Sequence, residues 1–210
     1  MNICYIFGSA DCKIKKICRD DSDCFIAADG GYNLMKKYNI KPDILIGDFD
    51  SLNEIPENTE TVRYPVRKDD TDLMLAVKHG FLKGFKKFII FGCLGGRLDH
   101  TYATIQTANY IINNGGKVIC VSNDECVSVT DNEMLFKEKK NGYISVFSLT
   151  DVSEGVCINN LSYPLSNAEL TSGFPLGVSN EFTGKKSSVK TNKGKLLVIW
   201  NGNHDDIIDF

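Results

Sequence analysis

Short apolar runs recur along the first part of the chain and alternate with stretches of helical character. The run Ile44–Ile46 lies between Pro42 and Gly47, and a fully apolar segment of this kind is what a strand buried in a parallel sheet requires. We expect the other strands of this sheet at residues 2–7, 24–28, 61–65, 87–91 and 117–121, and helices at residues 11–19, 32–38, 99–113 and from residue 73 onward. The alternation predicts an α/β domain with a Rossmann-like parallel sheet.

The pattern changes after Ser122. Five strand-like segments follow, separated by turns of Gly, Asn, Asp and Lys and by no convincing amphipathic helix, at residues 127–129, 143–149, 156–158, 187–191 and 196–200. Such a series is typical of an antiparallel β-sandwich. We therefore predict two domains, an α/β domain over residues 1–122 and an all-β domain over residues 123–210.

Composition narrows the possible functions. The 210 residues are 42% hydrophobic and carry a net charge of −3. The chain has no long basic stripe, so nothing suggests a nucleic-acid partner. The apolar runs are too short to cross a membrane, and the first ten residues lack the features of a secretory signal. The eight cysteines contain no Cys-x-x-Cys pair, which favours free thiols in a reducing, cytoplasmic compartment over disulfides or zinc.

Two carboxylates, Asp48 and Asp50, follow the strand at residues 44–46. The carboxyl ends of parallel strands are where ligands bind in open α/β sheets. Like charges this close repel each other unless a cation or a proton joins them. The structural alternative is that Asp48 caps a helix and that Asp50 forms an Asx turn with Ser51.

Three further strand ends carry polar motifs. These motifs are Asp29-Gly30-Gly31, Lys68-Asp69-Asp70-Thr71-Asp72 and Gly95-Gly96-Arg97-Leu98-Asp99-His100. Ordinary turns, an N-cap at Asp70 or Thr71, and a surface histidine at position 100 would explain part of this pattern. A parallel sheet would nevertheless gather the motifs at one edge, where oxygen ligands, glycine loops and an arginine suit magnesium and a polyphosphate. The residues alone predict a metal-dependent enzyme of phosphate or pyrophosphate transfer.

Taken as an ordered set, the motifs resemble the thiamine pyrophosphokinase family. The matching segments are Ala28–Gly31, Gly47–Ser51, Lys68–Asp72 and Gly95–His100, with a shorter match at Gly177–Phe182. The resemblance implies transfer of a diphosphoryl group from ATP, the co-substrate, to the hydroxyl of thiamine, which gives thiamine diphosphate and AMP. It also implies a homodimer with shared active sites, each between the α/β domain of one subunit and the β domain of the other.

The resemblance also implies roles for individual residues. Mg²⁺ would be bound by Asp48, Asp50 and Asp72, while Asp69 or Asp99 would orient the alcohol or accept its proton. The ATP and phosphate contacts would be Asp29, Gly30, Gly31, Lys68, Thr71, Gly95, Gly96, Arg97 and His100. Ser179 and Asn180 would lie on the thiamine side, with Tyr163 as a stacking partner, and Asp70 is given no role.

Two other functions stay open at this point. A metal-dependent phosphohydrolase would use the same aspartates to transfer phosphate to water and would need no second domain. A non-catalytic nucleotide or thiamine sensor would keep the pocket but would be expected to lack one of the metal aspartates.

Overall fold

The computed structural model describes residues 2–15, 17–49, 59–208 and 210. Asp50 and Ser51, which belong to one of the predicted site motifs, lie outside the described residues. The chain forms two compact units, Met1–Asn123 and Asp124–Phe210, and each is described by itself.

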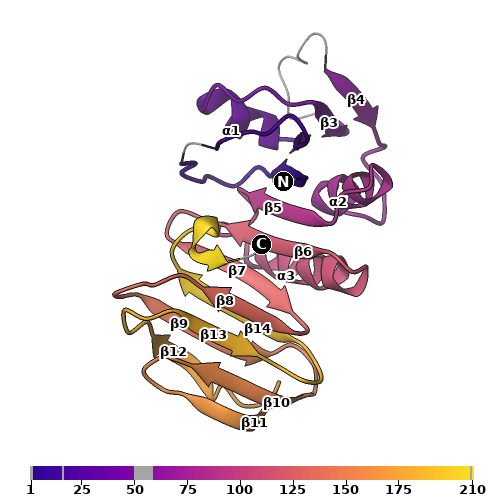
Figure 1. The fold of residues 1–210 in the computed structure, drawn as a ribbon. Helices are drawn as coiled ribbons and strands as arrows, with labels where there is room; N and C mark the ends of the chain where they lie inside the picture. The colour runs from indigo at the N-terminus through magenta and orange to yellow at the C-terminus, as the bar shows by residue number, and fades with distance from the viewer. Residues whose placement is uncertain (1, 16, 50–58, 209) are drawn as a thin grey trace. The chain divides into compact units, whose positions relative to one another are not determined.

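The N-terminal unit is built on a parallel sheet (Figure 1). Its described strands are β1 (Ile3–Phe7), β2 (Cys24–Ala28), β3 (Ile44–Gly47), β4 (Glu60–Arg63), β5 (Lys87–Phe91) and β6 (Lys117–Val121). They pair in the order β6-β5-β1-β2-β3-β4, and every one of these pairs is parallel. The chain winds outward from β1 to β4 and then returns to place β5 on the other side of β1. The sheet is therefore doubly wound, with its switch point between β1 and β5.

Three helices of the N-terminal unit connect these strands: α1 (Gly31–Lys37), α2 (Asp72–Leu82) and α3 (Leu98–Asn113). The ring of Phe81 in α2 lies 4.8 Å from Phe88 of β5 and 6.2 Å from Tyr110 of α3, measured between centroids. These contacts pack α2 and α3 beside each other against the sheet. The fully apolar strand sequences are explained by this burial, since all residues of β1, β2 and β3 are buried.

The helix predicted at residues 11–19 is wrong, because the described residues of this segment form no regular structure. Their polar groups bond to other elements instead. The backbone N–H of Lys13 donates to Asn123 Oδ1 at 2.6 Å, and the Cys12 thiol donates to the carbonyl of Val121 at 3.5 Å. These contacts fix residues 12 and 13 against the end of β6 and the residues just after it.

The C-terminal unit is an antiparallel β-sandwich. Its described strands are β7 (Glu125–Thr130), β8 (Glu133–Phe136), β9 (Tyr143–Ser148), β10 (Val152–Asn159), β11 (Leu165–Thr171), β12 (Gly177–Glu181), β13 (Ser187–Lys190), β14 (Leu196–Asn201) and β15 (Ile207–Ile208), with a 3₁₀ turn η1 at His204–Asp206. One sheet has the order β12-β9-β14-β7, and the other has the order β11-β10-β13-β8-β15. The Phe136 ring packs edge-on against Trp200 at 5.4 Å, which joins the two sheets in a common core. The predicted fold class, a parallel α/β unit followed by an antiparallel sandwich, is confirmed.

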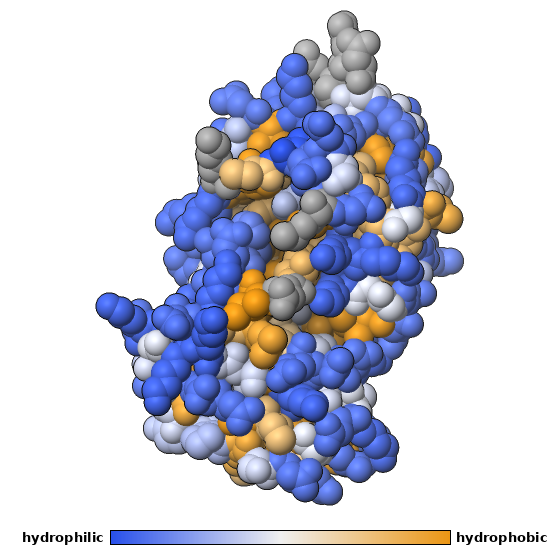
Figure 2. All heavy atoms as spheres, viewed as in Figure 1, coloured by the Kyte–Doolittle hydropathy of each residue, from blue (hydrophilic) through white to orange (hydrophobic). Residues whose placement is uncertain are grey.

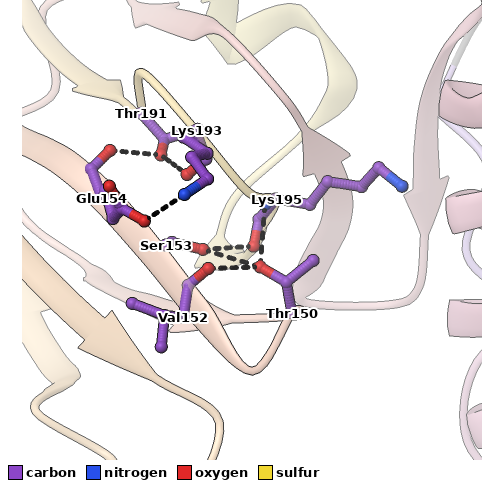
Figure 3. Close-up of polar contacts among 7 residues, drawn as sticks. All are labelled: Thr150, Val152, Ser153, Glu154, Thr191, Lys193 and Lys195. Atoms are coloured by element: carbon purple, nitrogen blue, oxygen red, sulfur yellow. Dashed lines mark hydrogen bonds and ion pairs between the residues drawn. The ribbon is translucent and has the colours of Figure 1, made fainter.

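A polar network fixes one end of this sandwich (Figure 3). The hydroxyl of Ser153, which is fully buried, lies 2.8 Å from Ser148 Oγ and donates to the carbonyl of Lys195 at 3.0 Å. Beside it, the Thr191 hydroxyl bonds to the carbonyl of Glu154 at 3.1 Å and to that of Lys193 at 2.8 Å. The hydroxyls thus satisfy backbone groups where the β9–β10 and β13–β14 turns meet.

Hydrophilic side chains cover most of the face drawn in Figure 2, and hydrophobic ones are scattered between them. Within the described residues, every helix is too short or too polar to span a membrane. All eight cysteines are free thiols.

Candidate active site

A cavity of about 520 Å³ lies at the carboxyl ends of the central strands of the N-terminal unit. Its lining comes from the segments that follow β1, β2, β3, β4 and β5 and from the starts of α2 and α3. The lining residues are Gly8, Ser9, Ala10, Ala28, Asp29, Asp48, Val66, Lys68, Asp70, Thr71, Asp72, Leu73, Gly92, Cys93, Gly95, Gly96, Arg97, His100, Ala103 and Thr104. The cavity therefore opens at the switch point of the sheet, where doubly wound folds bind ligands.

The floor of the cavity is made by two glycine turns that touch each other. The N–H of Gly8 donates to Phe91 O at 2.8 Å, and that of Ala10 donates to Gly92 O at 2.9 Å. Gly92 has a φ of +64°, and a Cβ on it would lie 2.6 Å from the carbonyl oxygen of Gly8. Only glycine fits at position 92, because any side chain would separate the two turns.

Lys68 lies between two of the predicted metal ligands. Its Nζ is 2.9 Å from Asp72 Oδ1 and 3.6 Å from Asp48 Oδ2. The three side chains are only 12%, 28% and 14% exposed, respectively. Burial alone would lower the pKa of Lys68, but the hydrogen bond and charge of Asp72, together with Asp48, outweigh it and raise that pKa. The lysine is thus a firmly charged bridge between the end of β3 and the start of α2.

The start of α2 is fixed by Thr71. Its hydroxyl oxygen accepts a hydrogen bond from the N–H of Met74 at 3.1 Å, so Thr71 is the N-cap. Asp70 also lines the cavity, and its Oδ2 lies 2.6 Å from Nζ of Lys78, which is in the second turn of α2. Asp69 is exposed, and among the described residues it is not part of the cavity lining.

The Asp29-Gly30-Gly31 turn has a packing explanation. Asp29 adopts a φ of +44°, and its N–H donates to the carbonyl of Ile46 at 2.7 Å. A Cβ on Gly31 would lie 1.8 Å from Phe7 O, so α1 can reach the sheet only with glycine at that position. Among the described residues, the cavity lining includes Asp29 but neither Gly30 nor Gly31.

The loop after β5 places the predicted arginine at the cavity. Gly95 and Gly96 have φ values of +86° and +67°, and a Cβ on either would meet open space. Arg97 lines the cavity, while its Nε donates to Asp99 Oδ1 at 3.1 Å and its Nη2 donates to Oδ2 of the same carboxylate at 2.5 Å. The hydrogen bond from Arg97 lowers the pKa of Asp99. His100 also lines the cavity, at the first turn of α3.

Thr104, a residue that sequence reasoning missed, fixes this loop. It is 3% exposed, and its hydroxyl donates to Cys93 O at 2.7 Å and also lies 3.0 Å from the carbonyl of His100. The signal for it was a threonine four residues after His100, on the same face of the helix. A polar residue on the buried face of a helix, next to the end of a strand, can indicate a side chain that hydrogen-bonds to the loop between them.

The predicted metal ligands are only partly represented in the described residues. Asp48 and Asp72 reach a common cation, the Lys68 ammonium, whereas Asp50 lies outside the described residues. Of the residues that the structure describes, no three His, Cys, Asp or Glu side chains are grouped to hold a metal ion. Two carboxylates beside a cavity nevertheless fit Mg²⁺, which proteins usually bind through one or two carboxylates plus substrate phosphates and water.

The predicted thiamine-side residues belong to β12 in the C-terminal unit. Asn180 is 3% exposed, and its amide group bonds to the backbone of Tyr163: Oδ1 accepts from the N–H at 2.9 Å, and Nδ2 donates to the carbonyl at 2.7 Å. Ser179 has a φ of +57°, and its N–H donates to Ser145 Oγ at 3.1 Å. The Tyr163 ring is exposed. Asn180 is therefore placed to hold the turn that presents Tyr163.

Fold and cavity together define a class of protein. The chain is an α/β protein with a polar cavity at the switch point of its sheet, where doubly wound enzymes bind their ligands, and it continues into an antiparallel β unit. Residues 16–120 match the family model "Thiamin pyrophosphokinase, catalytic domain", and residues 131–196 match "Thiamin pyrophosphokinase, vitamin B1 binding domain". The chain belongs to the thiamin pyrophosphokinase family.

Individual relatives agree with this assignment. The chain is 27% identical over 188 residues to thiamine pyrophosphokinase of Bacillus subtilis (strain 168). The aligned region covers 86% of this chain and 88% of the relative. It is 26% identical over 192 residues to thiamin pyrophosphokinase 1 of Caenorhabditis elegans, which covers 83% of this chain and 77% of the relative.

Solved structures show the same fold. The crystal structure of thiamine pyrophosphokinase from Bacillus subtilis has a TM-score of 0.84 at 24% identity and covers 96% of this chain and 99% of its own. Thiamin pyrophosphokinase from Candida albicans has a TM-score of 0.71 at 14% identity and covers 95% of this chain and 90% of its own. At these identities, the likeness supports the two-unit architecture.

Proposed function

We propose that this chain is a magnesium-dependent thiamine pyrophosphokinase that transfers a diphosphoryl group from ATP to thiamine. The thiamine hydroxyl oxygen forms a bond to the β-phosphorus of ATP, and the bond from that phosphorus to the oxygen bridging the α-phosphorus breaks. The products are thiamine diphosphate and AMP, and the hydroxyl proton passes to a carboxylate. The observation that carries the proposal is the cavity at the switch point, lined by Asp48, Lys68, Asp72 and Arg97 within the segment matched by the catalytic-domain model.

Asp48 and Asp72 are the proposed metal ligands, joined by Asp50 from outside the described residues. Magnesium bound there would neutralise negative charge on the phosphate oxygens as the bond to the β-phosphorus forms. Both carboxylates already face a cation, because they share the ammonium of Lys68. Their hard oxygen atoms are the ligand type that magnesium prefers.

The remaining cavity residues are proposed to hold the phosphates of ATP. Arg97 supplies a planar fork of donors, and the Gly95 and Gly96 turn leaves its backbone open to a close approach. Asp99 is bonded to Arg97, so we assign it the role of orienting that guanidinium. Asp69, exposed on the loop that leads into α2, is then the proposed acceptor of the hydroxyl proton.

Thiamine is proposed to contact the C-terminal unit through the segment that contains Ser179 and the turn that Asn180 holds. Large apolar side chains are exposed in this region, with Tyr163 at 67%, Phe174 at 65% and Val178 at 51%. Exposed apolar groups of this size favour burial against a partner. We therefore propose a homodimer in which the α/β unit of one subunit and the β unit of the other share each active site.

The reaction is tested by incubating the protein with ATP, Mg²⁺ and thiamine and identifying the products by mass. AMP with thiamine diphosphate is the expected result. ADP with thiamine monophosphate would mean a different transfer, and phosphate without a thiamine product would support the phosphohydrolase alternative. EDTA should abolish the reaction if magnesium is required.

Shared sites are tested by mixing two inactive variants, Asp48→Asn and Ser179→Trp. If each site takes one part from either subunit, a mixed dimer carries both lesions in one site and leaves the other intact. Activity should then return as subunits exchange. Proven exchange without any return of activity would assign each site to a single chain.

A further inference from the structure

The ammonium of Lys68 lies where a metal ion would have to bind. We infer that Lys68 competes with the divalent cation for Asp48 and Asp72, and that it moves to the phosphates of ATP when cation and nucleotide bind together. Lys68 would then couple the two binding steps, so that the complete substrate is bound more tightly than either part alone. This inference rests on the proposed function, because it takes Asp48 and Asp72 to be metal ligands.

The geometry gives Lys68 two anionic partners on different elements. Asp48 follows β3, Asp72 is the first residue of α2, and Nζ of Lys68 lies 3.6 Å from Oδ2 of the former and 2.9 Å from Oδ1 of the latter. All three residues line the cavity. The lysine therefore occupies the space between two carboxylates of the ligand-binding site.

A dication and an ammonium cannot both use these carboxylates at no cost. A magnesium ion bound to the same oxygens would lie close to the positive charge of Nζ, and the like charges would repel. The side chain of Lys68 is 12% exposed, so water screens this repulsion less than it would at an open surface. Binding of the metal ion therefore requires the ammonium to leave.

The displaced ammonium has an alternative within reach. Lysine has a flexible four-carbon stem, and the cavity of about 520 Å³ leaves room for the head group to turn. A polyphosphate in this cavity would offer it a dense negative charge. The charge count favours the exchange: the three proposed carboxylate ligands and Lys68 sum to −2, and a dication brings this sum to 0, so the site no longer repels the anionic nucleotide.

A neighbouring ion pair provides a matched control. Lys78 lies 2.6 Å from Oδ2 of Asp70, another cavity-lining carboxylate, but its side chain is 41% exposed. Asp70 is not a proposed metal ligand. Replacing Lys78 with Met removes the same type of charge from a carboxylate of the same cavity without freeing Asp48 or Asp72.

The test compares wild type, Lys68→Met and Lys78→Met in three binding measurements. The probes are Mn²⁺ alone, followed by electron paramagnetic resonance, and α,β-methylene-ATP, followed by calorimetry in EDTA and in saturating Mn²⁺. Lys68→Met should bind Mn²⁺ alone about tenfold more tightly, since the competing cation is gone. In saturating Mn²⁺, the same variant should bind the nucleotide about tenfold more weakly than wild type. In EDTA the loss of affinity should be smaller, roughly threefold at most. Lys78→Met should match wild type in all three.

A purely structural role for Lys68 gives a different pattern, in which the variant weakens all three binding events. That pattern, or unchanged Mn²⁺ affinity in Lys68→Met, would overturn the inference and leave the proposed reaction intact. If wild type itself binds no Mn²⁺ even with the nucleotide, then the metal assignment of the proposed function fails, and the inference fails with it.

A measurement on wild type covers the case in which Lys68→Met does not fold. Acetylation by an N-hydroxysuccinimide ester, read residue by residue by mass spectrometry, reports how accessible each amine is. Mn²⁺ alone should increase labelling of Lys68 severalfold relative to Lys78, and addition of the nucleotide analogue should reverse the increase. Labelling of Lys68 that does not respond to Mn²⁺ would refute the displacement.

Discussion

Replacing Asn180 with alanine should destabilise the C-terminal unit by about 2–3 kcal/mol. The substitution removes two bonds to Tyr163, one from its N–H at 2.9 Å and one to its carbonyl at 2.7 Å. It also removes the bond from the N–H of Glu181 to the same Asn180 oxygen at 2.9 Å. A buried backbone group left without a partner costs about 1–3 kcal/mol, so three such groups would cost roughly 3–9 kcal/mol in full. Partial access of water to the Tyr163 turn offsets part of this cost and brings the expected loss to about 2–3 kcal/mol.

The chain supplies its own reporter for this experiment. Trp200 is the single tryptophan, lies in β14 of the same unit and is 1% exposed. Its fluorescence during urea unfolding therefore follows the unit that contains Asn180. Asn159→Ala is the control, because Asn159 is exposed and donates one side-chain bond, to Ser188 Oγ at 3.1 Å. It should change the free energy of unfolding by less than about 1 kcal/mol.

A second variant separates hydrogen bonding from side-chain volume. Asn180→Asp keeps the shape, but it replaces the donor Nδ2 by an oxygen facing the carbonyl of Tyr163. Asn180→Asp should lower the free energy of unfolding at least as much as Asn180→Ala does. If the proposed function is correct, KM for thiamine should also rise severalfold, while KM for ATP stays unchanged. Equal stability of Asn180→Asp and wild type would refute the assigned orientation of the amide. If Asn180→Ala lowers the free energy of unfolding by less than about 0.5 kcal/mol, water replaces the amide group, and the Asn180 side chain does not fix the turn.

Three further outcomes are expected. Thr191→Val should lower the free energy of unfolding by about 1 kcal/mol, because it removes the buried hydroxyl where the two turns of Figure 3 meet. Urea unfolding followed by Trp200 fluorescence measures this change, and no change would mean that the hydroxyl is not required by the carbonyls that it contacts. Arg97→Lys should raise KM for ATP about tenfold in steady-state kinetics, because a point charge replaces the bidentate fork, and kinetics equal to wild type would make Arg97 a surface charge. Asp72→Asn should reduce kcat by roughly 10²–10³-fold with an unchanged urea midpoint, and near-normal turnover would remove Asp72 from the metal site.

The parallel half of the fold was predictable from the sequence because burial on both faces leaves a clear trace. Ile44–Ile46 is apolar without interruption, and β3 is indeed buried throughout. The same reasoning failed for the segment at 11–19, whose alternation of apolar and basic residues suits a helix. There, tertiary bonds to Val121 and Asn123 determine the backbone, and those partners lie more than a hundred positions away in sequence.

The sandwich was predicted less completely. The strands β8, β11, β12 and β15 were missed, and the polar sequence of β11, Leu165–Thr171, shows why. Only Leu170 of this strand is buried, because β11 lies at the edge of its sheet. An edge strand with one buried residue has no hydrophobic period for sequence reasoning to detect.

The candidate site was predictable in its location but not in its internal contacts. Strand ends gather at one edge in any parallel sheet, so the motifs around Asp48, Asp72 and Arg97 could be placed together from sequence order. The partner of each charge could not be placed, because ion pairing depends on side-chain positions a few ångströms apart. Lys68 illustrates this: the sequence suggested a phosphate ligand, whereas the structure shows a cation shared by two acids. We infer from that contact that the lysine competes with the metal as well as binding the phosphate, and the sign of the change in Mn²⁺ affinity separates these proposed roles.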